Sequence, residues 1–153
     1  MAASEWVFIS YETVLGLNLA RLAKMRLELV GLSGWVWQDD SCIGEYTYEE
    51  IANRVFEFAH FLYICTPTSH ECAGQIDERG YAKAAGHQAV VIAFDKKDIS
   101  PILSNVRQER TTNIGFQDSC DLAAKIFLER NSVPAATDEP ATSEMLPRTT
   151  VSG

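Results

Sequence analysis

Glu78 is the residue whose type and neighbours best suit a catalytic carboxylate. It falls in the first turns of an expected helix, and Ala82 and Ala85 follow it on the same face, at i+4 and i+7. Because these neighbours are small, we expect open space beside the carboxylate. One carboxylate close to an anomeric carbon serves as nucleophile or electrostatic stabiliser when a glycosidic bond breaks through an oxocarbenium-like transition state. If the leaving base is already cationic, no general acid is needed, and a single glutamate is a workable site.

An acid near the start of a helix usually serves only the helix dipole, and this remains the alternative for Glu78. Two further acids, Glu71 and Asp77, lie close to it in the sequence. Glu71 precedes the expected helix and suits its cap region, whereas Asp77 should point roughly 100° away from Glu78. The sequence therefore favours Glu78 among the three.

Polar side chains also follow the ends of three expected strands. In an open parallel sheet, ligands bind in the crevice at the carboxyl ends of the strands, so these segments are the ones to search. The candidate substrate-binding residues in them are Ser10, Tyr11, Asp39 and Ser69. For Asp39, and for Asp40 beside it, simple solvation of a loop is the alternative interpretation.

The elements that must position these residues alternate between strands and helices. Short apolar runs rich in β-branched and aromatic residues predict strands over 6–10, 34–38, 61–65 and 88–94, with an edge strand over 111–116. Apolar residues at helical spacing predict helices over 13–30, 47–59, 73–85 and 118–130. This alternation predicts an α/β, flavodoxin-like, three-layer fold with a central parallel sheet of about five strands and helices on both faces.

Several local signals support these boundaries. Thr47 with Glu50 three residues on is typical of a capping box, and Gly31 and Gly86 are expected to end helices. Trp35 and Trp37 alternate along one expected strand and should share a face, where core packing is favoured over base stacking.

Residues 1–130 are expected to form one domain. After position 130 the composition shifts to Pro, Ala, Thr, Ser and acids with almost no bulky apolar residues. Residues 131–153 are therefore predicted to be a disordered tail, or a linker to a further domain of a longer chain.

Composition excludes several function classes. The formal net charge of -8 argues against nucleic acid as a partner, because phosphate binding needs a basic surface. The four cysteines form no CxxC pair and the three histidines are isolated in sequence, so neither a metal site nor a redox motif is indicated. No run approaches the ~18 apolar residues of a membrane span, and we expect a soluble, cytoplasmic protein.

Four segments together resemble the bacterial Toll/interleukin-1 receptor (TIR) domains. Val7–Tyr11 and Val36–Asp39, the second followed by a loop ending at Gly44, look like the opening of the family. The run from Phe61 to Ser69 is similar to its strand and Ser-Pro-x-Ser turn, and the segment from Glu78 to Ala82 is similar to its catalytic helix. The resemblance spans roughly residues 5–130.

The resemblance implies an NAD glycohydrolase or cyclase that cleaves the nicotinamide–ribose bond, with NAD as substrate and no bound cofactor. Glu78 would then be catalytic, Ser10 and Tyr11 would lie near the nucleotide, and Ser69 would border the ribose and phosphates. The loop from Asp40 to Tyr46 would correspond to the family's gating and assembly loop. It further implies self-association through TIR–TIR contacts, a role in immune or antiphage signalling, and a downstream effector or sensor as partner.

Two alternatives stay open. The stretch 74–86 also looks like nucleoside 2-deoxyribosyltransferases, whose nucleophilic glutamate precedes a similar helix. A TIR domain that only assembles, as an adaptor does, is the non-enzymatic alternative. The sequence leaves open whether the product is ADP-ribose, a cyclised isomer or a conjugate.

Overall fold

The computed structural model describes residues 3–41, 47–93, 107–111 and 115–132. Its centre is a five-stranded sheet in the order β2-β1-β3-β4-β5, in which every neighbouring pair is parallel. The strands are β1 (Ala3–Ser10), β2 (Ser33–Trp35), β3 (Phe58–Cys65), β4 (Gln88–Ala93) and β5 (Arg107–Thr111). This is the flavodoxin-like strand order, with β5 at one edge. The predicted fold class is confirmed.

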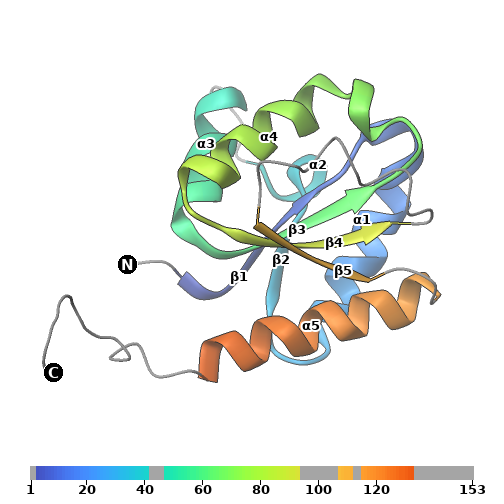
Figure 1. Cartoon of the computed structure of the whole chain (residues 1–153), viewed down its shortest axis with the longest axis vertical. Coiled ribbons are helices and arrows are strands. Elements are labelled where there is room, and N and C mark those ends of the chain that lie inside the picture. Colours follow the sequence, from blue (N-terminus) through green and yellow to red (C-terminus); the bar gives the residue numbers. More distant parts are fainter. Residues whose placement is uncertain (1–2, 42–46, 94–106, 112–114, 133–153) are drawn as a thin grey trace, which may run out of the picture.

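Helices cover both faces of the sheet (Figure 1). On one face lie α1 (Thr13–Glu28) and α5 (Phe116–Ser132), and on the other lie α3 (Thr47–Glu57) and α4 (Ala73–Ala84). Two short helices, α2 (Trp37–Asp40) and the 3-10 turn η1 (Ser69–Glu71), follow β2 and β3 at the carboxyl end of the sheet. Within the described ranges, no helix combines the length and the apolar character that crossing a membrane requires.

The two faces of the sheet have different cores. Along β1, Val7 and Ile9 pack towards α1 and α5, whereas Phe8 packs towards α3 and α4. The first core holds many small residues on its helices, whereas the second is dominated by aromatic rings, with Phe8 stacked between Trp35 and Phe61. Because β1 is buried on both faces, its run from Trp6 to Ser10 is continuously apolar until the last residue.

The second strand is shorter than predicted. The expected strand 34–38 is wrong in its second half, because β2 ends at Trp35 and Trp37 begins α2. The backbone N–H groups of Asp39 and Asp40 donate to the Val36 carbonyl, and the Asp40 carboxylate accepts from the Val36 N–H at 2.7 Å. These local bonds turn the chain, so Trp35 and Trp37 do not share a strand face.

Several other boundaries also differ from prediction. The helix predicted over 47–59 ends at Glu57, because Phe58 joins β3, pairs with Ala3 and stacks on Trp6 at a centroid distance of 5.1 Å. The edge strand predicted over 111–116 is displaced to Arg107–Thr111. Its sequence is polar and charged, and such residues on an edge strand discourage pairing with another chain.

Helix α5 begins at Phe116, inside the predicted strand, and continues to Ser132. The first two residues of the expected tail are thus helical, while positions 133–153, most of the loop expected over 40–46 and the Thr47 side chain lie outside the described residues.

Candidate active site

Ser10 and Glu78 meet at the carboxyl end of β1. The Ser10 hydroxyl donates to the Oε1 atom of Glu78 at 2.6 Å, although the two residues are 68 positions apart. Ser10 is the last residue of β1, and Glu78 lies on the inner face of α4. The fold thus brings the predicted catalytic residue to a predicted substrate-binding residue, at the sheet edge where ligands of this fold class bind.

The Glu78 carboxyl is almost fully enclosed. Its residue exposure is 8%, and burial raises its pKa to about 8, against a partial lowering by the Ser10 hydrogen bond and a further rise from the charge of Asp77. Ala82 is buried in the aromatic core, so its small side chain lets α4 approach the sheet and does not leave the open space expected on that side. A carboxyl group that titrates near neutrality is suited to acid, base or electrostatic roles at physiological pH.

Gln75 completes the polar cluster, and it was missed from the sequence. Its side chain is fully buried, and its Nε2 atom donates to Ser10 Oγ at 3.3 Å and to the Ile64 carbonyl at 3.1 Å. Gln75 precedes Glu78 by three positions, which places the two on one helix face. That i, i+3 spacing was the signal available in the sequence.

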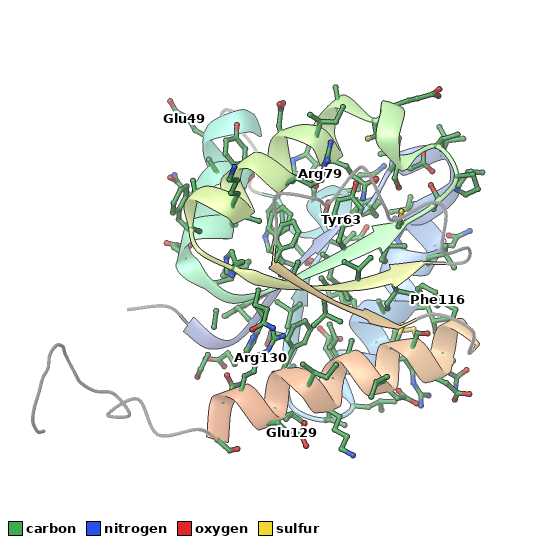
Figure 2. The ribbon with its side chains drawn as sticks, in the orientation of Figure 1. Glu49, Tyr63, Arg79, Phe116, Glu129 and Arg130 are labelled. Carbon is green, nitrogen blue, oxygen red and sulfur yellow. The ribbon has the colours of Figure 1, made fainter. Side chains whose placement is uncertain are left out.

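Three buried polar atoms beneath α4 have no hydrogen-bond partner in the described part of the chain. They are the Tyr63 hydroxyl, Gln75 Oε1 and Arg79 Nε. Tyr63 lies beside Ser10 in the β1–β3 register, and burial raises its pKa far above the usual range, partly offset by the charge of Arg79. Figure 2 shows Tyr63 and Arg79 between α4 and the sheet. Unsatisfied buried polar atoms are rare in folded proteins, and departures of this kind are expected at functional sites.

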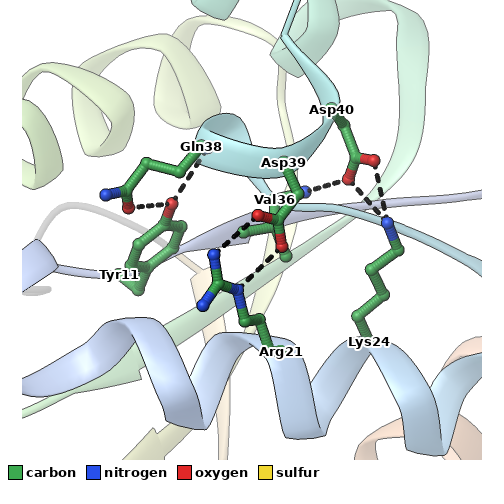
Figure 3. Close-up of polar contacts among 7 residues, drawn as sticks. All are labelled: Tyr11, Arg21, Lys24, Val36, Gln38, Asp39 and Asp40. Atoms are coloured by element: carbon green, nitrogen blue, oxygen red, sulfur yellow. Dashed lines mark hydrogen bonds and ion pairs between the residues drawn. The ribbon is translucent and has the colours of Figure 1, made fainter.

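Tyr11 links the end of β1 to α2. Its hydroxyl donates to Gln38 Oε1 at 2.7 Å and accepts from the Gln38 N–H at 3.2 Å, as Figure 3 shows. Burial raises the pKa of Tyr11 to about 12, and the negative charge of Glu78 adds to that rise. Tyr11 is therefore close enough for an electrostatic interaction with Glu78, while its hydroxyl is hydrogen-bonded to Gln38.

Asp39 is held away from this cluster by an ion pair. Both of its carboxylate oxygens accept from the Arg21 guanidinium, at 2.8 and 2.9 Å, and Asp40 likewise accepts from Lys24 (Figure 3). The Arg21 hydrogen bond holds the pKa of Asp39 below its usual range. Both carboxylates thus bind α2 to α1, and the structure does not bring Asp39 to Glu78.

Ser69 is fully buried in the turn after β3. Its hydroxyl accepts from the Thr66 N–H at 2.9 Å and donates to the Ile64 carbonyl at 3.4 Å. That same carbonyl accepts from Gln75, so Ser69 adjoins the cluster through a shared acceptor. Its predicted contact with ribose and phosphate stays a prediction.

A cavity of about 440 Å³ lies between the start of α1 and the turn that precedes α4. It is lined by Glu12, Thr13, Val14, Leu15, Thr68, Glu71 and Cys72. Glu78 does not line it. A larger cavity of about 520 Å³ lies between α1 and α5, on the far side of the sheet from Glu78. We regard the smaller one as relevant because it lies at the carboxyl end of the strands.

His60 and His87 lie away from this cavity and from Glu78. His60 contacts the Ser4 carbonyl and Asn131, and His87 contacts the Val55 carbonyl at 2.6 Å, near the amino ends of the strands. Over the described ranges, no three His, Cys, Asp or Glu side chains gather as metal ligands would.

The sequence matches no protein-family model and no curated protein. Solved structures of similar fold include a TIR-STING receptor from C. gigas, in complex with 2',3'-cGAMP, at a TM-score of 0.57 and 16% identity over 77% of this chain and 38% of that one. A CMP N-glycosidase from Clostridium botulinum matches at a TM-score of 0.56 and 13% identity, over 81% of this chain and 98% of that one. A diflavin flavoprotein from Nostoc sp. matches at a TM-score of 0.54 and 12% identity, over 86% of this chain and 97% of that one. At these identities the likeness concerns the fold, which is TIR-like and flavodoxin-like.

Proposed function

We propose that this protein is an NAD glycohydrolase or cyclase of the TIR type, with Glu78 as the catalytic carboxylate. The observation that carries the proposal is the 2.6 Å hydrogen bond between Ser10 and a nearly buried Glu78 at the carboxyl end of the sheet. The similarity of the fold to a receptor with a TIR domain and to a nucleotide N-glycosidase supports it. We place the reaction in the cytoplasm, in immune or antiphage signalling.

In this reaction the bond between the anomeric carbon and the nicotinamide nitrogen breaks. Its electron pair goes to nicotinamide, which leaves neutral, and positive charge develops on the ribose. Ionised Glu78 stabilises that charge or bonds to the anomeric carbon. In hydrolysis, attack by water gives ADP-ribose and releases one proton; in cyclisation, a nitrogen of the adenine base replaces water.

The enclosure of Glu78 suits a cationic substrate. The raised pKa keeps the carboxyl mainly protonated at neutral pH when the site is empty. A bound nicotinamide cation favours the ionised form, because an opposite charge nearby lowers the pKa of an acid. The negative charge is then generated where the positive charge will develop, in a setting from which water is largely excluded.

Three further residues are proposed around this centre. Tyr11, held against Gln38, forms a wall on the α2 side, and Ser69 supports the turn beside the ribose and phosphates. Asp39 reaches substrate only if its pair with Arg21 opens. Self-association through TIR–TIR contacts, and a downstream effector or sensor, complete the proposal.

The decisive experiment is NAD turnover by concentrated protein with Glu78→Gln, followed by chromatography of the nucleotide products. We expect turnover to fall by at least about a hundredfold, with folding intact. The matched control is Asp77→Asn, at the exposed acid next to Glu78 on the same helix, and it should keep most of the activity. Unchanged turnover in Glu78→Gln removes the catalytic proposal and leaves an assembly domain as the alternative.

A second candidate is N-glycosidic cleavage of a nucleotide or nucleoside other than NAD. The observation that favours it is the match to the CMP N-glycosidase, which covers 98% of that chain against 38% of the TIR-STING receptor. Parallel incubation with NAD, CMP and deoxynucleosides separates the candidates. Release of nicotinamide alone supports the NAD reaction, whereas release of cytosine, or base exchange on deoxynucleosides, supports the second.

A further inference from the structure

Gln75 is a fully buried amide on the inner face of α4. A helix that covers a sheet normally presents apolar side chains to it, so this residue departs from the local rule. Its Oε1 atom has no hydrogen-bond partner in the described ranges. An unsatisfied buried acceptor is destabilising, which argues that the position is not occupied by an amide for the sake of stability.

The orientation of the Gln75 amide follows from its neighbours. Its nitrogen lies 3.1 Å from the Ile64 carbonyl oxygen and 3.3 Å from Ser10 Oγ. Because a carbonyl oxygen only accepts, the amide must present its NH2 group to this side. Ser10 Oγ is therefore an acceptor towards Gln75.

The orientation of the Ser10 hydroxyl follows in turn. A serine hydroxyl has one hydrogen, and its oxygen already accepts from Gln75. The short contact with Glu78, at 2.6 Å, is then the one to which Ser10 donates. Gln75 also donates to the Ile64 carbonyl, so its amide nitrogen is held between β3 and the Ser10 hydroxyl.

We infer that Gln75 is a positioning residue, whose amide holds the Ser10 hydroxyl so that its single hydrogen points at the Glu78 carboxylate. We call these two hydrogen bonds, from Gln75 to Ser10 and from Ser10 to Glu78, the relay. It connects α4 to β1 and back to α4, and it stabilises the ionised carboxylate. Its catalytic importance rests on the proposed use of Glu78.

Other charged groups also bear on Glu78 and must be held constant. Asp77 on the same helix raises its pKa, and Glu78 in turn raises the pKa of Tyr11, just after β1, and of Tyr63 on β3. Arg79 lowers the pKa of Tyr63. None of these side chains donates to Ser10, so a change at Gln75 can be tested without altering them.

The test is Gln75→Met, which keeps the length of the side chain and removes both the donor and the unsatisfied acceptor. The pKa of Glu78 is followed by NMR of protein labelled at the glutamate carboxyl carbons, with Glu78→Gln assigning the signal. We expect that pKa to rise, with the ionised fraction at pH 7 falling about tenfold for each pH unit of the rise. The control is Ile76→Met, at the adjacent exposed position of the helix.

Two further measurements separate positioning from a structural role. The melting temperature of Gln75→Met should be equal to or above that of the parent, and Gln75→Leu offers a second apolar shape. In a Ser10→Ala background, Gln75→Met should change the pKa of Glu78 no further, because the relay is already broken. If NAD is cleaved, the acid limb of kcat/KM moves to higher pH in Gln75→Met.

An unchanged Glu78 pKa in Gln75→Met, an equal change with and without Ser10, or failure of both apolar variants to fold overturns the inference. The titration needs no turnover. A protein that fails to cleave NAD but shows the expected pKa changes would disprove the proposed function and leave the relay intact.

Discussion

The cores on the two faces of the sheet differ in composition. On the side of α1 and α5 the core is mainly apolar, and small residues such as Ala20, Ala23 and Ala123 let the helices lie close. Its buried polar residues include His60, which packs on Phe127, and Ser119. On the side of α3 and α4, aromatic rings fill the core up to the carboxyl ends of the strands, where Ser10, Gln75 and Glu78 replace them. Burying polar groups costs free energy, so this end of the second face gives up part of the stability that its aromatic core supplies.

The largest effect is expected on the apolar face. Phe127 on α5 is fully buried, and Phe127→Ala should lower the free energy of unfolding by about 3 to 5 kcal/mol, because it removes a large side chain from a packed core. Denaturant unfolding measures this, with Leu128→Ala, at a half-exposed neighbour, as a milder control. A comparable loss in both variants would contradict the idea that packing of Phe127 in the core sets the cost.

The next effect concerns the polar face and pH. An exposed glutamate titrates near 4.5, whereas folded Glu78 titrates near 8. Between these values the folded state holds a proton that the unfolded chain has lost, so this group's stabilising contribution is full below pH 4.5 and is lost as pH rises to about 8. Relative to Glu78→Gln, the parent should lose roughly 1.4 kcal/mol of stability per pH unit in that window.

Unfolding of both proteins in denaturant at several pH values checks this slope. Parallel stability curves for the parent and Glu78→Gln would mean that Glu78 is not buried in its protonated form. The stability of Asp77→Asn should change with pH almost as that of the parent does, since Asp77 is exposed.

A smaller effect is expected on the pH dependence of turnover. If ionised Glu78 is the active form, kcat/KM for NAD should rise about tenfold per pH unit below pH 8 and level off above it, since that profile reports the free enzyme. In Asp77→Asn the level region should begin at slightly lower pH, because a negative charge that raises the Glu78 pKa is removed. A profile that is flat from pH 5 to 8 would contradict the role.

The smallest effect is expected at the rim, where α2 meets α1. Asp40→Ala should cost about 1 kcal/mol, because the Val36 N–H loses its acceptor. Asp39→Ala should lower the melting temperature less, and high salt should remove most of that difference, because its pair with Arg21 is exposed. A clear rise in KM for NAD in Asp39→Ala, with Asp40→Ala unaffected, would instead support substrate contact by Asp39.

The sequence alone determined the alternation of strands and helices, and with it the layered parallel sheet. The apolar run Phe61–Cys65 has the length and composition of a buried strand, and the leucines of α1 have the spacing of a helix. Glu78 and Ser10 were also accessible, since strand ends and helix starts in this fold class converge on one edge. The predicted strand at Trp37 was wrong because local hydrogen bonds turn the chain there. The edge strand β5 was misplaced because its polar sequence has no apolar pattern.

Only the tertiary structure decided which polar groups touch. In the sequence Gln75 is an ordinary helical residue, and only the packing of α4 on the sheet brings it to Ser10. Asp39 is a candidate substrate-binding residue in the sequence, but in the structure it pairs with Arg21. The protonation of Glu78 belongs to this second level, because desolvation depends on every chain segment that covers the carboxyl. Periodicity is a property of neighbours along the chain, whereas burial and pairing are set by segments that lie far apart in it.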